Sequence, residues 1–376
     1  MKIAYVAPYS SSFSNSANSI HVFKMSEAYQ NLGHECYLYI DGLTECNQIN
    51  KHYSKLFDVS DDLKIFSLPF LNRFRSIKLI FQVPYIVKMK KVDLVHTRNI
   101  AVAFGCSFLF KIPTILELHN LPPSNFKVKV FFNLFHKSLY AKLLISITNS
   151  LKEDILRMFT LKCPIVVFPD GVSSKYLNSN IDAFNFKIKL NSELSNKTWL
   201  VYTGSFNVGK GTDLILEIAK QRLEFIFILV GNFPDGIDSV VTSNVLLVRP
   251  DNFEEVICYQ RSADILLLPL EDKVYGVGKN AEEIGKYTSP LKMFEYMASK
   301  RPILASNKSV LKEILNHREN SFLVDSNEID DWIYAIDSLL FNPDLANSIS
   351  QNAFEDVKKF TWERRAEWIL KSILVQ

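Results

Sequence analysis

The sequence predicts an α/β protein with two Rossmann-like, doubly wound domains. Short runs of β-branched and other apolar residues alternate with helical patterns along the 376-residue chain, which is typical of parallel sheets with crossover helices. The alternation stops in a polar, asparagine-rich stretch at residues 173–196 and then starts again. The length also suits two domains, since one domain typically takes about 150 residues.

The first domain is expected at residues 1–172, and its repeating unit is clearest at the start. Val22, Met25 and Tyr29 recur at helical spacing between the first two apolar runs, and Gly33 follows, where a helix commonly ends. This order of strand, helix, glycine and strand predicts a βαβ unit. The expected strands are 3–7, 36–40, 63–68, 93–97, 114–118, 144–148 and 165–168.

A second Rossmann-like domain is expected at residues 197–358, after a linker region at 173–196. Ligands of such sheets bind at the carboxyl ends of the strands, so two domains that face each other across a cleft would hold a substrate between them. This geometry suits a transferase or a closing binding protein. The expected strands are 199–203, 225–230, 245–248, 265–268, 302–305 and 321–324.

The composition is that of a globular protein. A chain that is 48% hydrophobic and 22% charged is not expected to be disordered. The most apolar later stretch, 100–110, is shorter than the roughly 20 residues of a membrane-spanning helix, and the apolar N-terminal run is too short for a signal peptide. The cysteines lack metal-site spacing, which suits a reducing compartment. They are Cys36, Cys46, Cys106, Cys163 and Cys258.

The charges are distributed unevenly along the chain. Residues 1–190 hold 23 Lys and Arg against 13 Asp and Glu, whereas residues 191–376 hold 20 against 27. A basic half could meet nucleic acid or an anionic membrane. Basic and large apolar residues interleave at 73–81 and 126–137, as they do in segments that lie on lipid headgroups. Ordinary amphipathic helices packed on a sheet are the alternative.

The first candidate site opens the second domain. The expected strand 199–203 leads into a loop with Gly204, Ser205 and Lys210, and a helical pattern follows. A glycine-containing loop, a lysine and a helix N-terminus together form an anion site. A P-loop nucleoside triphosphatase is disfavoured because Gly211 stands where its motif needs a Mg²⁺-binding Ser or Thr. The alternative role of Lys210 is that of a solvated loop residue.

The second candidate site lies at the start of an expected helix. Ser289 can cap this helix, and Pro290 fits its first turn. Lys292 and Glu295 then share one face. The lysine suits a phosphate, and the glutamate can accept hydrogen bonds from two ribose hydroxyls, each contributing about 1.5–3 kcal/mol. The alternative is a surface Lys–Glu pair that contributes only about 0.3–0.5 kcal/mol.

The third candidate is His119, at the carboxyl end of the expected strand 114–118. A polar side chain at this position faces the ligand edge of a parallel sheet, although a lone histidine is also commonly structural. The other histidines form no pair at metal-binding spacing, and the chain has no Asp-x-Asp to hold a divalent ion on a diphosphate. Neither a Ser-His-Asp order nor a GxSxG elbow supports acyl transfer.

Together these segments resemble glycosyltransferase family 4, whose members are retaining enzymes of the GT-B fold, and the resemblance covers nearly the whole chain. The segments that carry it are His21-Val, Gly33-His-Glu, Val92-Asp-Leu-Val-His96, Glu117-Leu-His119-Asn, Pro169-Asp-Gly-Val172, Lys210-Gly, Ala263-Asp264 through Leu268-Pro269, Ser289-Pro-Leu-Lys-Met-Phe-Glu-Tyr-Met-Ala and Phe360-Thr-Trp362-Glu-Arg. The last of these resembles the C-terminal helix of the family, so residues 359–376 would cross back to the first domain.

The resemblance implies a nucleotide-diphosphate sugar as donor. Lys210 would hold the diphosphate, Glu295 the ribose hydroxyls and His119 the donor sugar near the reacting carbon, which makes His119 and Lys210 the catalytic candidates. Attack would come from the front face within an ion pair, without a protein nucleophile. A lysine and helix N-termini would take the place of a metal, and no cofactor is expected. The other donor-binding candidates are Gly204, Ser205, Ser289, Pro290, Leu291 and Lys292.

The chain departs from the family pattern at two positions. Tyr287 stands where the first glutamate of a paired-glutamate motif is expected, so the residue that contacts the donor sugar is open among Tyr287, Glu282, Glu283 and the backbone of the following turn. Ser205 stands where an arginine often precedes the Lys-Gly pair, and Lys292 is the candidate for the missing positive charge.

The first domain would bind the acceptor, a glycan or a lipid-linked glycan, and the transferred sugar would be a hexose, as in bacterial surface-polysaccharide synthesis. The expected location is cytoplasmic, peripheral on the inner face of the cytoplasmic membrane through the basic first domain, without nucleic acid as a partner. Two alternatives share this architecture: a nucleotide-sugar epimerase or hydrolase, and an inactive nucleotide-sugar-binding scaffold suggested by Tyr287.

Overall fold

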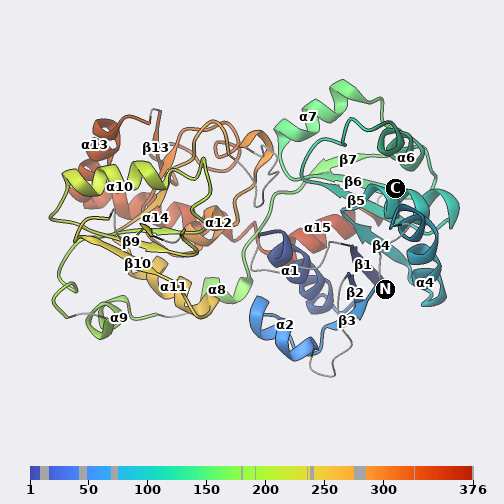
Figure 1. Ribbon diagram of the computed structural model, residues 1–376, viewed down its shortest axis with the longest axis horizontal. Coiled ribbons are helices and arrows are strands. Elements are labelled where there is room, and N and C mark those ends of the chain that lie inside the picture. The colour runs from blue at the N-terminus through green and yellow to red at the C-terminus, as the bar shows by residue number, and fades with distance from the viewer. Residues whose placement is uncertain are drawn as a thin grey trace. The chain divides into compact units, whose positions relative to one another are not determined.

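A computed structural model describes residues 1–8, 17–41, 49–68, 75–178, 181–190, 192–234, 236–237, 241–274, 285–325 and 327–374. The chain forms two compact units. The first unit comprises Met1–Asp170 and Trp362–Gln376, and the second unit comprises Gly171–Thr361. Each unit contains one sheet with helices packed around it (Figure 1).

The sheet of the first unit has seven parallel strands in the order β3-β2-β1-β4-β5-β6-β7. Its central strands are covered on both faces and are therefore apolar almost throughout. β1 pairs with β2 on one side and with β4 on the other. The strands are β1 (Lys2–Ala7), β2 (Glu35–Ile40), β3 (Lys64–Ser67), β4 (Leu94–Thr97), β5 (Thr114–Leu118), β6 (Ala141–Ser146) and β7 (Ile165–Val167).

The helices of the first unit follow the crossover pattern that the sequence predicts. In the first of them Val22, Met25 and Tyr29 are buried, and Gly33 follows with a φ of +80°, which confirms the predicted βαβ unit. Side-chain caps begin three others, from Asn99, Asn125 and Thr148. The helices are α1 (Ala17–Asn31), α2 (Ile49–Phe57), α3 (Arg75–Ile77), η1 (Lys78–Gln82), α4 (Val83–Met89), α5 (Ile100–Phe104), η2 (Gly105–Leu109), α6 (Phe126–His136), α7 (Asn149–Met158) and α15 (Trp362–Leu374).

The C-terminal helix α15 belongs to the first unit, although it follows the whole of the second unit in sequence. It lies beside α1, and Figure 1 shows the red helix α15 next to the dark blue helix α1. Buried side chains, among them Trp362, Ala366 and Ile369, attach it to this unit.

The second unit has six parallel strands in the order β10-β9-β8-β11-β12-β13. The strands are β8 (Trp199–Thr203), β9 (Ile226–Val230), β10 (Val245–Val248), β11 (Ile265–Leu268), β12 (Ile303–Ser306) and β13 (Phe322–Val324). The helices are α8 (Ser174–Asn178), α9 (Ala183–Leu190), α10 (Thr212–Gln221), α11 (Phe253–Ser262), η4 (Gly285–Tyr287), α12 (Leu291–Ala298), α13 (Ile329–Leu340) and α14 (Pro343–Val357).

The stretch 173–196, expected as a linker region, is part of the second unit and carries α8 and α9. Tyr176 is buried against the core of this unit. Lys187 holds α9 in place, because its Nζ lies 2.8 Å from Oδ2 of Asp264 and 4.9 Å from the centre of the Trp199 ring. Both helices are short, and the apolar residues Phe184, Phe186, Ile188 and Leu190 of α9 recur at every second position, which is not a helical period. The sequence therefore suggested a linker.

No helix in the described part of the chain is both long enough and apolar enough to cross a bilayer.

Candidate functional site

A buried carboxylate in β5 is the centre of a group of side chains that we call the Glu117 cluster: His21, His96, Glu117, His119, Asp170 and Arg365. Oε1 of Glu117 lies 2.6 Å from Nε2 of His119 and 2.9 Å from Nε2 of His21. Oε2 of Glu117 lies 3.1 Å from Nε2 of His96 and 3.1 Å from Nη2 of Arg365. Each carboxylate oxygen therefore has two nitrogen atoms within 3.1 Å, and it has two lone pairs.

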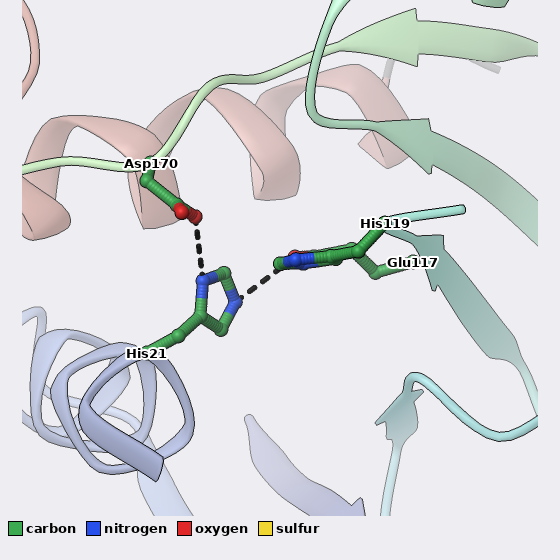
Figure 2. Close-up of side chains that lie close together, drawn as sticks. All are labelled: His21, Glu117, His119 and Asp170. Atoms are coloured by element: carbon green, nitrogen blue, oxygen red, sulfur yellow. Dashed lines mark hydrogen bonds and ion pairs between the residues drawn. The ribbon is translucent and has the colours of Figure 1, made fainter. Parts of the chain in front are cut away.

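Further contacts fix two of the histidines of the cluster. The Tyr29 hydroxyl lies 2.9 Å from Nδ1 of His96. Nδ1 of His21 lies 2.7 Å from Oδ1 of Asp170, and Figure 2 shows the His21 ring between Asp170 and the Glu117 carboxylate. Nδ1 of His21 is therefore hydrogen-bonded to Asp170, and its Nε2 lies within ion-pair distance of Glu117.

Arg365 reaches the cluster from α15 and is 2% exposed. Its Nε donates to the carbonyl of Pro169 over 2.8 Å and its Nη2 to the carbonyl of Phe168 over 3.1 Å. Burial alone would raise the pKa of Glu117, but the charge of Arg365, followed by that of His21, holds this pKa well below its usual range. Glu117 is therefore a carboxylate at neutral pH.

His119 lies just beyond the carboxyl end of β5, at the edge of the sheet where the sequence placed it, and it is partly exposed. Burial, followed by the positive charge of Arg98, lowers its pKa to about 3. At neutral pH the ring is therefore uncharged and is hydrogen-bonded to Glu117 through Nε2.

Four groups of the cluster lie close enough together to hold a metal ion: His21, Glu117, His119 and Asp170 offer ligand atoms within 4.8 Å of one another. These atoms already pair with each other. The guanidinium of Arg365 also contacts Glu117, and its charge opposes a second cation. We therefore assign no ion to this cluster.

The second unit holds a separate polar site at the ends of β8 and β9. The loop after β8 turns through glycines with positive φ, Gly204 at +138°, Gly209 at +86° and Gly211 at +69°, and Gly211 is the N-cap of α10. Side chains would not fit there, since a Cβ on Gly209 would meet the carbonyl of Lys273 and one on Gly211 would meet Pro269. The glycines thus let the backbone of this loop pack closely against Pro269 and Lys273 just before α10 begins.

Two lysines converge on this loop. Lys292, in the first turn of α12, places its Nζ 3.8 Å from the centre of the Tyr202 ring, and a Cβ on Gly204 would lie 2.7 Å from that Nζ. Burial, followed by the charge of Lys210, lowers the pKa of Lys292 well below its usual range. Burial also lowers the pKa of Lys210. Both side chains remain partly accessible to solvent, so a ligand can reach them.

Glu295 lies one turn after Lys292 and also remains partly accessible. Its Oε2 accepts a hydrogen bond from Nε2 of Gln260 over 3.1 Å, and the same Nε2 lies 3.0 Å from Oγ1 of Thr203. Burial raises the pKa of Glu295 to about 7, against the opposing effects of Gln260 and then Lys292. The amide of Gln260 therefore aims a carboxyl group that changes charge near neutral pH.

The predicted donor-site residues all lie in the second unit, and the structure corrects the roles of two of them, Ser289 and Pro290. Ser289 does not cap α12: Pro290 is the N-cap, without a side-chain hydrogen bond, and Leu291 begins the helix. The extended backbone of Pro290, with ψ of 120°, excludes it from the first turn and shifts the helix start. The carbonyl of Ser205 accepts from the Tyr202 hydroxyl over 2.7 Å.

The candidates for contact with the donor sugar are described only in part. Tyr287 closes the 3₁₀ turn η4 and is partly exposed, with Nζ of Lys286 5.4 Å from the centre of its ring. Glu282 and Glu283 lie outside the described residues.

Sequence reasoning missed several side chains that complete the two sites. Glu117 could have been found, because an acidic residue inside an otherwise apolar strand needs buried partners. Arg365 and Gln260 gave no local signal, since each lies on an amphipathic helix like many other polar residues.

Two family models match the chain. Residues 19–176 match the model described as Glycosyltransferase Family 4, and residues 197–342 match the model described as Glycosyl transferases group 1, so the matches together cover well over half of the chain. An uncharacterized glycosyltransferase of Methanocaldococcus jannaschii is 26% identical over 322 residues, which are 80% of this chain and 81% of the relative. A D-inositol 3-phosphate glycosyltransferase of Rhodococcus jostii is 22% identical over 225 residues, 55% of this chain and 46% of the relative.

Solved structures share the fold. A glycosyltransferase from Rickettsia africae superposes with a TM-score of 0.74 at 17% identity, over 99% of this chain and 97% of the other. The Anabaena protein HepE, solved in complex with UDP, has a TM-score of 0.74 at 14% identity, over 100% of both chains. At these identities the likeness concerns the fold alone.

Proposed function

Since the chain belongs to glycosyltransferase family 4 and has the two-domain α/β architecture called GT-B, we propose that it moves a sugar from a nucleotide-diphosphate sugar to a glycan or lipid-linked glycan, with retention of the anomeric configuration. The observation that carries this proposal is the pair of lysines in the second unit. Burial disfavours the charged form of both Lys210 and Lys292, and each is partly accessible. A diphosphate would relieve this cost by pairing with both ammonium groups.

The remaining groups of the second unit suit the other parts of such a donor. The carboxylate of Glu295 can accept hydrogen bonds from two vicinal ribose hydroxyls. The nucleobase would lie near the ends of β9 and β10, where the Arg249 guanidinium stacks 4.0 Å from the centre of the Phe233 ring. Tyr287, Glu282 and Glu283 are the candidates for contact with the sugar.

In the first unit, His119 would contact the donor sugar. A neutral ring with one lone pair can accept a hydrogen bond from a sugar hydroxyl. We propose that the diphosphate leaves with help from the two lysines and from backbone N–H groups, without a metal ion. Turnover that survives prolonged chelation by EDTA, with no metal in the purified protein by elemental analysis, is the expected result. Activity that EDTA abolishes and added Mg²⁺ or Mn²⁺ restores would contradict metal independence.

A panel of nucleotide sugars, incubated with and without lipid-linked glycan acceptors, tests the function. We expect nucleoside diphosphate to be released from one hexose donor, only when an acceptor is present, and the product linkage to keep the anomeric configuration of the donor. Donor turnover without acceptor would favour an epimerase or hydrolase. Donor binding without turnover under any condition would favour the inactive scaffold that Tyr287 suggests.

We also propose that the first unit lies on an anionic membrane, such as the inner face of the cytoplasmic membrane in polysaccharide synthesis. Successive turns of the α3, η1 and α4 segment present Ile77, Phe81, Tyr85 and Met89, all more than half exposed. The opposite side of this segment is buried through Leu79, Val83 and Val87. The exposed lysines that complete the charge pattern are Lys88, Lys90 and Lys91. Apolar residues beside lysines suit the interface of anionic lipids.

Vesicle sedimentation tests this membrane surface. The protein should sediment with vesicles that contain phosphatidylglycerol, less so at high salt, and hardly with phosphatidylcholine alone. A variant with Phe81→Ser, Tyr85→Ser and Met89→Ser should lose most of this binding. The control is Tyr334→Ser, which removes an equally exposed aromatic residue of the second unit. Equal sedimentation of both variants would contradict the assignment.

A further inference from the structure

Glu117 fixes the hydrogen-bonding role of His119. Nε2 of His119 lies 2.6 Å from Oε1 of Glu117, which is ionised and can only accept. A neutral imidazole has one N–H, so this contact requires that the proton sit on Nε2. Nδ1 then carries a lone pair. Within the described part of the chain no residue hydrogen-bonds to this Nδ1, and the His119 side chain is 19% exposed. The ring can therefore accept a hydrogen bond from a substrate hydroxyl.

Arg365 in turn keeps Glu117 ionised and in place. Its guanidinium lies 3.1 Å from Oε2, while backbone carbonyls of Phe168 and Pro169 hold its other N–H groups. The guanidinium thus connects α15 to the segment after β7 and to Glu117 of β5. A lysine could supply the charge but could not make the same set of parallel hydrogen bonds.

We infer that Glu117 and Arg365 are positioning residues for His119: Glu117 holds the ring in the Nε2–H form, and Arg365, from the C-terminal helix, holds Glu117. This inference rests on the proposed function only for the role of His119 in sugar transfer. It gives α15 a role in the reaction through Glu117. The return of the chain to the first unit is what brings the guanidinium to β5.

Other charged and titratable groups surround the same carboxylate and determine what the loss of Arg365 does. His21 of α1 and His96 of β4 contact this carboxylate. Behind them Asp170 contacts His21 and Tyr29 contacts His96, and the charge of Arg98 acts on His119. Without Arg365 the cluster loses the positive charge that acts most strongly on Glu117. A neutral histidine of the cluster, His119 or His96, then gains a proton more readily.

Nitrogen-15 NMR of the histidine side chains tests the inference without an activity assay. Comparison with a His119→Ala sample identifies the His119 signals. In the unsubstituted protein we expect the Nε2–H form of His119, without titration between neutral pH and about pH 5, because a neutral ring buried beside Arg98 resists protonation. An Nδ1–H form, or protonation of His119 in that range, would overturn the inference.

Arg365→Met is the matching variant, and Arg364→Met is its control, since Arg364 lies on the same helix, is 60% exposed and contacts Glu367. In Arg365→Met the acid side of the pH profile of kcat should shift to higher pH and kcat should fall at least about tenfold, the effect of losing roughly 1.4 kcal/mol. The donor KM should change little, because the contacts proposed for the diphosphate and the ribose lie in the second unit and are not altered. Arg365→Lys should recover part of kcat.

If Arg365→Met fails to fold, Glu117→Gln takes its place. The amide of this variant carries no negative charge and has only one accepting oxygen, so His119 should lose the Nε2–H form or become protonated between neutral pH and about pH 5. An unchanged His119 signal and pH profile in both variants would overturn the inference. The proposed function fails separately: if NMR shows the expected form of His119 but no nucleotide sugar is turned over, the positioning stands and the transferase proposal falls.

Discussion

Lys292 illustrates at the scale of one residue how a binding site can cost stability. Its ammonium group is buried beside Lys210, so in the donor-free protein its charge is poorly compensated. Lys292→Met keeps most of the apolar stem and removes the charge. We expect a higher melting temperature without donor and a smaller upward shift when a nucleoside diphosphate is added. Thermal unfolding measures both, with Lys312→Met, at an exposed position, as control. A lower melting temperature without donor would contradict this.

Glu295 gives the second unit a pH dependence of the opposite kind to an ordinary surface carboxylate. Its pKa rises to about 7 in the folded protein, from 4.5. Between these values the folded state binds more protons than the unfolded state, so its contribution favours folding at low pH and is lost as the pH rises through about 7. Glu295→Gln should flatten this part of the stability curve.

Denaturant unfolding of both proteins between about pH 5 and pH 8 measures this difference. The gain in stability from Glu295→Gln should be larger at the upper end of the range. A difference that is constant with pH would mean that Glu295 ionises in the folded protein much as it does in the unfolded chain.

At the scale of an element, the loop between β8 and α10 depends on glycine for two separable reasons. Gly211 has a φ of +69°, and any Cβ there would also collide with Pro269. Gly236, which lies outside this loop and serves as the comparison, has a φ of +83° and no atom of a described residue within 4 Å of a Cβ built there. Gly211→Ala adds a steric conflict to the backbone strain, while Gly236→Ala adds the strain alone. We expect only Gly211→Ala to weaken binding of nucleoside diphosphate by an order of magnitude or so. Calorimetric titration of both variants decides, and equal affinities would contradict the role of this loop.

The strands were predictable from sequence because their signal is local. Each expected strand overlaps a strand of the structure, since a short apolar run between turns is typical of a buried parallel strand. The helices α8 and α9 were not recognised, because Tyr176 and Lys187 reach the core as single residues without an apolar stripe. The N-terminus of α12 was shifted because Ser289 and Pro290 both carry start signals, and only the backbone angles distinguish them.

At the scale of the whole molecule, the first unit is completed by a segment that follows the second unit in sequence. A variant truncated after Phe360 lacks α15. Glu117 then retains its contacts with the histidines of the cluster but loses its ion pair with Arg365. Removing one partner of a buried ion pair typically costs about 3–5 kcal/mol. We expect calorimetry to show a lower melting temperature for the first unit and an unchanged transition for the second. Two unchanged transitions would show that α15 is not needed for the stability of the first unit.

The sequence revealed more of the second-unit site than of the Glu117 cluster, because the residues of the cluster are far apart in the chain. Lys210 is marked by its glycine loop, and Lys292 and Glu295 lie one turn apart, so short-range spacing was enough. The residues of the Glu117 cluster come from α1, β4, β5, the segment after β7 and α15. Local sequence patterns do not predict contacts between such distant segments. His119 was recognised through its strand end, but its partner Arg365 was not.

The central claim is that the two lysines of the second unit bind the diphosphate of a donor. Calorimetric titration with a panel of nucleoside diphosphates and the matching monophosphates tests it most directly. We expect one diphosphate to bind more tightly than its monophosphate, and Lys210→Ala and Lys292→Ala each to weaken it by about 10- to 100-fold, because a hydrogen bond to a charged group contributes about 1.5–3 kcal/mol. Lys312→Ala should bind like the unsubstituted protein. Undiminished diphosphate binding in both lysine variants would contradict the claim.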